Sequence, residues 1–145
     1  EKNTLKTVID KDYINIFYPD TADVKDPRIQ SVVKRSILIT WKMEAEEILP
    51  ALIHSLASEY GLKFSSVRIR NNKTRWGSCS GKNNINLNLH LVRLPRHLCE
   101  YVILHELAHT IHKNHGKSFW NMLDKMTGNA RGLDRELNSY RISVW

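Results

Sequence analysis

Apolar residues recur every three to four positions over residues 29–56, and this spacing predicts one long amphipathic helix. Asp26 suits the cap of that helix, and Pro27 suits its first position because the missing proline N–H would have no partner there. Gly61 suits its end. We expect a kink or break just before Pro50, because proline removes a helix hydrogen bond.

Alternating apolar and polar residues predict strands at residues 13–18, 66–70 and 85–91. We expect the first strand to end an N-terminal β element, residues 1–25, whose pairing partners precede residue 1. The other two strands are expected to form a small antiparallel sheet with a long connection.

The polar face of the strand at residues 85–91 carries Asn86, Asn88 and His90. A plain solvent face would explain these side chains. A strand beside a catalytic site could also bind an extended peptide through main-chain hydrogen bonds.

The last third of the chain predicts shorter helices over residues 98–112, 117–126 and 133–140. Pro95 opens the first of them, Gly128 ends the second, and Gly132 precedes the third. Residues 26–145 therefore predict one α+β domain, in which the small sheet packs against the long helix and the helix at residues 98–112.

The motif His-Glu-x-x-His occupies residues 105–109. His105 and His109 lie one turn apart on one helix face, so both imidazoles can bind one metal ion. Glu106 can then take a proton from a metal-bound water. Apolar residues on both sides of the motif indicate burial, which is costly for histidine and glutamate unless they are paired or bind a metal.

A catalytic zinc usually takes three protein ligands and one water, so a third ligand is required. His115 can serve if the helix stops and the chain turns back, and Gly116 suits such a turn. Glu136 on a later helix would give a His-His-Glu set, and His112 continues the helical row. We rank them in that order, because a straight row cannot surround a tetrahedral ion.

The chain has 145 residues with 41% hydrophobic content, enough for one domain with a core. No apolar run approaches the ~20 residues of a membrane span, so no membrane association is expected. Cys79 and Cys99 form no Cys-x-x-Cys pair, which favours a reducing compartment, and we expect a cytoplasmic location. Cys79 is interpreted as a packed or zinc-proximal thiol.

The formal net charge is +7, and residues 63–99 contain no Asp or Glu. Their cations are Lys63, Arg68, Arg70, Lys73, Arg75, Lys82, Arg93 and Arg96. Such a stretch could attract nucleic acid. A solubilising surface explains it equally well, so nucleic-acid binding is possible but not favoured.

Several motifs follow one another in order: RWGSCS at residues 75–80, an Asn-rich strand from Asn84, Pro95, HELAH at residues 105–109, His115 with Gly116, and Phe119 with Trp120. In this order they resemble the YgjP-like metallopeptidases, relatives of the SprT-like group, over residues 60–124. This chain shares Gly116 with SprT-like sequences, whereas many YgjP-like sequences have Ser at this position, so the subgroup stays open.

The resemblance implies a zincin-like fold, one zinc ion on His105, His109 and His115, and Glu106 as the catalytic base. It also implies that the loop at residues 75–79 and its strands wall the active-site cleft. Residues expected to contact a peptide or protein substrate are Arg75, Trp76, Asn86 and Asn88.

From the motif we expect a zinc-dependent hydrolase that cleaves peptide bonds through a Glu-activated, zinc-bound water. Two alternatives stay open. One is a nucleic-acid-associated, SprT-like protease or a DNA-binding module, whose binding would weaken steeply with salt. The other is a non-catalytic structural zinc domain, which would close its site with a fourth ligand such as Glu136 or Cys79.

Overall fold

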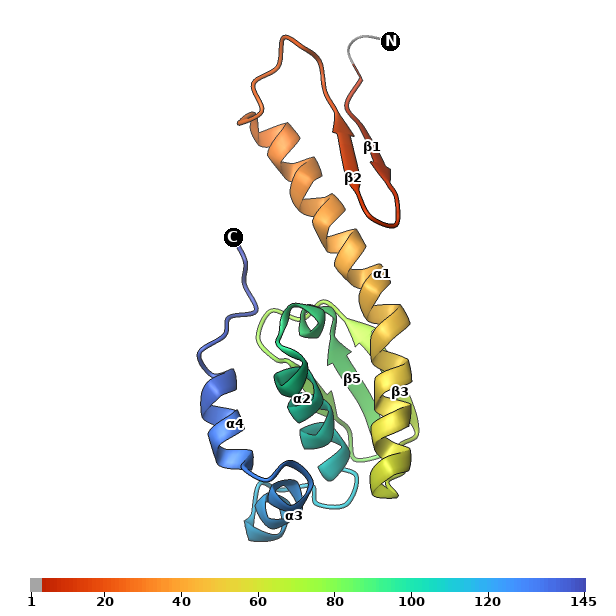
Figure 1. The fold of residues 1–145 in the computed structure, drawn as a ribbon, viewed down its shortest axis with the longest axis vertical. Coiled ribbons are helices and arrows are strands. Elements are labelled where there is room, and N and C mark those ends of the chain that lie inside the picture. The colour runs from red at the N-terminus through yellow and green to blue at the C-terminus, as the bar shows by residue number, and fades with distance from the viewer. Residues whose placement is uncertain (1–3) are drawn as a thin grey trace. The chain divides into compact units, whose positions relative to one another are not determined.

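The computed structural model describes residues 4–145 and divides into two units, Glu1–Met43 and Glu44–Trp145, with the boundary inside a long helix. In chain order the elements are β1 (Lys6–Ile9), β2 (Ile14–Phe17), α1 (Pro27–Tyr60), β3 (Ser66–Arg70), β4 (Gly77–Cys79), β5 (Asn84–Asn88), a 3₁₀ helix (Leu89–Arg93), α2 (Arg96–Ala108), α3 (Lys117–Thr127) and α4 (Ala130–Leu137) (Figure 1). No helix among the described residues is both long and apolar enough to cross a membrane.

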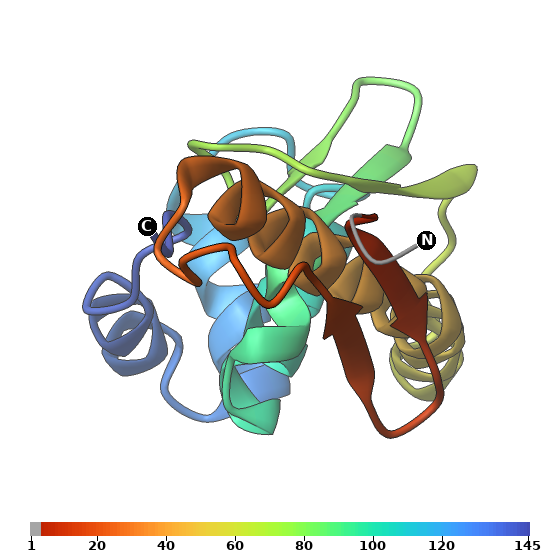
Figure 2. The ribbon, with the colours of Figure 1, turned by 90° about the horizontal axis from the view of Figure 1, so that it is seen from above.

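The first unit contains an antiparallel hairpin of β1 and β2, which lie side by side in both views (Figure 1, Figure 2). The strand predicted at residues 13–18 is therefore confirmed as β2. Within the described residues it pairs with β1, a strand that the alternation pattern did not predict. The first three residues of the expected 1–25 element lie outside the described part of the chain.

Helix α1 begins at Pro27 and ends at Tyr60, as its cap signals predict. Asp26 Oδ1 accepts a hydrogen bond of 2.8 Å from the Arg28 N–H, and Gly61 has a φ of 66°. The helix continues through Pro50, so the expected break is absent. Leu49 and Ile53 on either side are fully buried, and this packing holds the helix together across the missing hydrogen bond.

The sheet of the second unit has the strand order β3-β5-β4. The two predicted strands, β3 and β5, pair in parallel, so the expected antiparallel pairing was wrong. The reason is the third strand, β4, within the connection, which pairs antiparallel with β5. The chain reverses twice between β3 and β5, and two reversals restore the original direction.

Strand β5 ends at Asn88, three residues earlier than predicted, and a 3₁₀ helix follows. Asn88 Oδ1 accepts a 3.1 Å hydrogen bond from the His90 N–H and thereby caps this helix. Asn88 is 1% exposed and His90 is 5% exposed. The interpretation of this face as solvent-facing was therefore wrong at both residues.

Helix α2 contacts β4 and β5 and also packs against α3 and α4, as Figure 1 shows within this unit. It ends at Ala108, earlier than the predicted residue 112, and Gly128 ends α3 as predicted. Helix α4 begins at Ala130, so Gly132 lies inside the helix rather than before it. The unrecognised cap was Asn129, whose side chain accepts a 3.1 Å hydrogen bond from the Gly132 N–H.

These elements confirm the expected fold class, an α+β fold with a small sheet, a long N-terminal helix and a helix that carries the His-Glu-x-x-His motif. The core of the second unit combines residues 44–60 of α1, the inner face of the sheet and α2. Ile85 and Leu87 of β5 and Leu107 of α2 are fully buried in it. The motif therefore lies on a helix with many buried residues, and this packing gives its side chains a fixed place.

Candidate active site

A chain reversal at the end of α2 places three histidines together. His105 lies in the last turn of α2, His109 is its cap residue, and His115 precedes α3. The N–H groups of Ile111 and His112 both bond to the Ala108 carbonyl, at 3.1 and 2.9 Å, where the chain leaves the helix. The structure thus provides the helix stop that His115 requires to turn back toward the other two.

The imidazole nitrogens converge on one point. His115 Nε2 lies 3.0 Å from His109 Nε2 and 3.2 Å from His105 Nε2. All three ligand atoms lie within 4.8 Å of one another. Around a tetrahedral ion with Zn–N bonds of about 2.0–2.1 Å, neighbouring ligand atoms would be roughly 3.3 Å apart. The spacing therefore fits a zinc ion.

Protonation of the rings also fits a metal site. The His109 Nδ1–H donates to the His112 carbonyl at 2.8 Å, which leaves the Nε2 lone pair directed at the cluster. Burial, followed by the neighbouring His109 and His115, lowers the pKa of His105 to about 3. Burial likewise lowers the pKa of His109. A neutral ring with a free Nε2 lone pair can bind a metal ion.

Phe119 of α3 supports all three imidazoles. Its side chain is fully buried and stacks on His109, with ring centroids 4.5 Å apart. It meets the His105 and His115 rings edge to face, each with centroids 4.9 Å away. One rigid aromatic ring therefore limits the rotation of the whole cluster. Trp120 is half-buried, meets the His105 ring edge to face with centroids 6.5 Å apart, and lies beneath the guanidinium of Arg131.

Glu106 is 7% exposed, and burial raises the pKa of its carboxyl to about 7 despite the nearby Arg75. The carboxylate fits against Gly77 of β4, where a Cβ atom would come within 3.0 Å of Glu106 Cγ. A buried carboxyl with this pKa can both hold and release a proton near neutral pH.

The histidines and Glu106 open into one cleft of about 390 Å³. Its other lining residues are Arg75, Gly77, Ser78, Cys79 and Lys113. Thus β4 forms one wall of the cleft and the end of α2 forms the other. Cys79 is half-buried in this wall, and burial raises the pKa of its thiol, so the uncharged thiol is favoured.

The other candidate ligands lie elsewhere. Glu136 Oε1 lies 2.8 Å from His97 Nε2, and Glu136 is outside the histidine cluster. His112 contributes its backbone carbonyl rather than its ring. Within residues 4–145 the cluster consists of His105, His109 and His115. The structure therefore brings together the first-ranked set of three.

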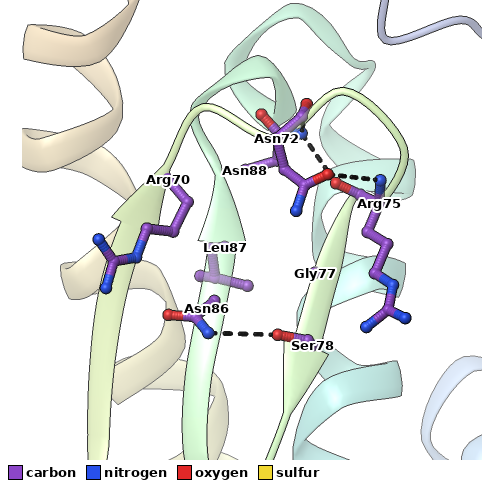
Figure 3. A pocket seen from close by; sticks show the side chains of 8 residues that line it. All are labelled: Arg70, Asn72, Arg75, Gly77, Ser78, Asn86, Leu87 and Asn88. Carbon is purple, nitrogen blue, oxygen red and sulfur yellow. Dashed lines mark hydrogen bonds between the residues drawn. The ribbon is translucent and has the colours of Figure 1, made fainter.

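Of the residues expected to contact substrate, Arg75 and Trp76 lie at the histidines. Asn86 faces the outer side of the sheet, where its Nδ2 donates to Ser78 Oγ at 3.3 Å (Figure 3). Asn88 is buried, and its Nδ2 donates to the Asn72 and Arg75 carbonyls at 2.7 and 2.8 Å. Asn88 therefore holds the loop that presents Arg75.

Sequence reasoning missed three residues of the site. Tyr101 lies four positions before His105, and that spacing could have placed it on the motif's face. In the sequence, Gly77 could be recognised only as part of the RWGSC motif. Asp134, whose Oδ1 accepts a 3.0 Å hydrogen bond from the Tyr101 hydroxyl, reaches the site by tertiary packing alone and carries no local signal.

Comparisons with known proteins agree with this geometry. A family model described as "YgjP-like, metallopeptidase domain" matches residues 6–140. The chain is similar to the metallopeptidase zymogen of Pyrococcus abyssi abylysin, with 27% identity and a TM-score of 0.54, over 63% of this chain and 94% of that one. It shares its fold with the metallopeptidase zymogen of Methanocaldococcus jannaschii jannalysin, with 24% identity and a TM-score of 0.54, over 62% and 93% of the two chains. No curated protein matches.

Proposed function

The chain belongs to the YgjP-like metallopeptidase domain family, and from this premise we propose that it hydrolyses peptide bonds with one zinc ion on His105, His109 and His115 and with Glu106 as general base. One observation carries the proposal: three convergent imidazoles and a buried carboxylate share one open cleft. A catalytic zinc site keeps a position for water, whereas a structural site is closed by protein ligands.

A zinc ion held by these imidazoles would supply a Lewis acid for the attacking water and for the carbonyl oxygen of the scissile bond. Glu106 accepts the proton of that water on its carboxylate and later delivers it to the nitrogen of the leaving amine. The burial that raises the pKa of Glu106 supports this second step, because a protonated carboxyl is then stable between the two transfers.

Substrate binding is proposed for the wall formed by β4. This strand lies at the edge of its sheet, and Gly77, Ser78 and Cys79 all line the cleft. An extended peptide could add alongside it through main-chain hydrogen bonds, which give affinity independent of side chains. Arg75 and Trp76 would then contact side chains of the bound peptide.

The location and the nucleic-acid alternative stay predictions. Cys79 and Cys99 are both free thiols, which supports the proposed cytoplasmic location. The basic stretch at residues 63–99 supports nucleic-acid binding only through its charge, and salt-dependent binding to a DNA duplex would test it.

The decisive variant is Glu106→Gln, which keeps the shape of the side chain and removes the base. We expect it to bind zinc as the wild type does and to lose hydrolysis of a fluorogenic peptide library. Glu100→Gln is the matched control, because Glu100 is on the same helix and pairs with Arg96 at 2.7 Å, outside the cleft. If Glu106→Gln still hydrolyses peptides, Glu106 is not the general base.

A further inference from the structure

A second pocket of about 200 Å³ adjoins the catalytic cleft. The residues that line both are Arg75, Gly77, His105 and Glu106. The residues that line only the second pocket are Trp76, Tyr101, Val102, Asp134 and Leu137. Small-molecule sites usually measure about 300–1,000 Å³, so this pocket is sized for one side chain of a larger substrate.

Asp134 is the charged residue that lines this pocket and not the cleft. Its Oδ1 accepts a 3.0 Å hydrogen bond from the hydroxyl of Tyr101, which is 1% exposed. Burial, and then Asp134 itself, raise the pKa of Tyr101, so the hydroxyl keeps its proton and remains a donor. Within the described residues no Lys, Arg or His forms an ion pair with Asp134. A half-buried carboxylate is thus held in place without an ion-pair partner among the described residues, although the Arg131 charge reaches the Tyr101 hydroxyl beside it.

We propose that this pocket binds a basic side chain, lysine or arginine, of the peptide substrate. The inference rests on the proposed peptidase function and names the substrate class for it. The cationic group would pair with Asp134, and its aliphatic stem would lie along Trp76 and Leu137, because long basic side chains bury their stems on apolar and aromatic surfaces.

Arg75 does not cancel this preference. It is exposed and lines the cleft as well as the pocket, and its charge acts on Glu106, the pKa of which it lowers against the effect of burial. Asp134 lines only the second pocket. Arg131, on the same helix as Asp134, places its guanidinium 3.7 Å from the centre of the Trp120 ring. The second pocket therefore has a carboxylate, Asp134, that does not line the cleft, whereas Lys113 lines only the cleft.

Binding can be measured without hydrolysis in the zinc-loaded Glu106→Gln protein. The probes are fluorescent, N-acetylated peptides in which one Lys, Arg, norleucine or Glu is moved through a neutral sequence, with Kd read by fluorescence anisotropy. We expect Lys or Arg at one position to bind about tenfold more tightly than norleucine, as a partly buried charge pair allows. Peptides with a free N-terminus and no basic side chain test whether an α-amino group serves instead.

Asp134→Asn in the same background should remove the preference, since the amide oxygen still accepts from Tyr101 but the charge is lost. Glu136→Gln is the matched control: it removes the same charge from an exposed site on the same helix and should keep the preference. Asp134→Lys should favour the Glu peptide. A preference unchanged by both substitutions at Asp134, or preference for the free α-amino group alone, would overturn the proposal.

The two proposals fail in different ways. If Glu106→Gln binds basic peptides selectively but the wild type hydrolyses none of the panel, the peptidase mechanism fails and the pocket assignment stands. If the wild type hydrolyses peptides and its Lys-to-norleucine ratio of kcat/KM is the same in Asp134→Asn, the pocket assignment fails. A misfolded Asp134→Asn protein would show an altered thermal unfolding curve. In that case the preference of Asp134→Lys for the Glu peptide decides whether the pocket assignment holds.

Discussion

Gly77→Ala is the sharpest test of how the base is positioned, because Gly77 has no role in the proposed chemistry itself. The new Cβ atom would lie 3.0 Å from Glu106 Cγ, 3.2 Å from Glu106 Oε1 and 3.2 Å from the Asn86 carbonyl oxygen. The carbonyl belongs to the neighbouring strand β5 and cannot move freely. The Glu106 side chain must therefore move away from the new Cβ atom.

The size of the effect follows from these distances. Carbon atoms pack best at about 3.5–4.0 Å, so Glu106 must shift by about 0.5 Å. A misplacement of about 1 Å can cost about 100-fold in rate, and half of it predicts about tenfold lower kcat/KM. Overpacking costs about 1–3 kcal/mol of unfolding free energy, and the Gly-to-Ala change in the unfolded chain offsets about 0.4–1 kcal/mol.

The assay compares kcat/KM on a fluorogenic peptide, zinc content and thermal unfolding. Gly81→Ala is the matched control, because a Cβ atom at Gly81 would meet nothing within 4 Å. We expect Gly77→Ala to lose activity while it keeps zinc, and Gly81→Ala to match the wild type. Full activity in Gly77→Ala would refute the reasoning, and so would a loss of activity explained by lost zinc or by unfolding.

Two further predictions concern the metal and the loop. His115→Ala should lose zinc and Glu136→Ala should retain it, measured by metal analysis after dialysis, and the opposite result would make Glu136 the third ligand. Zinc at about 1,000 times its Kd should raise the wild-type unfolding free energy by about 4 kcal/mol, and by clearly less in His115→Ala. Asn88→Ala should lower the unfolding free energy, measured in urea, by about 2–4 kcal/mol, since three hydrogen bonds are lost. Asn84→Ala, at an exposed site, should change the unfolding free energy by less than about 1 kcal/mol. Equal effects of the two substitutions would contradict the assigned role of Asn88.

Local signals predicted the features that depend on a few neighbouring residues. The first and last residues of α1 follow from Asp26, Pro27 and Gly61, because caps act through backbone groups within one turn. The spacing of the His-Glu-x-x-His motif predicted that both histidines share a helix face. The return of His115 was predictable because only a chain reversal can bring a third imidazole around an ion.

Features that depend on distant residues were not predictable from these patterns. The parallel pairing of β3 with β5 requires recognition of β4, a strand too short to show alternation. The basic stretch is not one surface: Arg93 Nη2 donates to the Ile142 carbonyl at 2.6 Å, and Arg96 pairs with Glu100. Sequence distance alone hides the contact of Arg93 with Ile142 and that of Asp134 with Tyr101.

The strand end at Asn88, which alternation placed three residues too late, explains the position of the proposed substrate-binding wall. Alternation assigns every second polar side chain of a strand to solvent, but this holds only while the backbone stays in the sheet. At Asn88 the backbone leaves it, and the amide turns inward to bind the carbonyls of Asn72 and Arg75. Its own N–H donates to the Trp76 carbonyl at 2.9 Å. One buried amide therefore fixes the loop that presents Arg75 and Trp76 beside the histidines, and the substrate contact proposed for these two residues depends on the fold through Asn88.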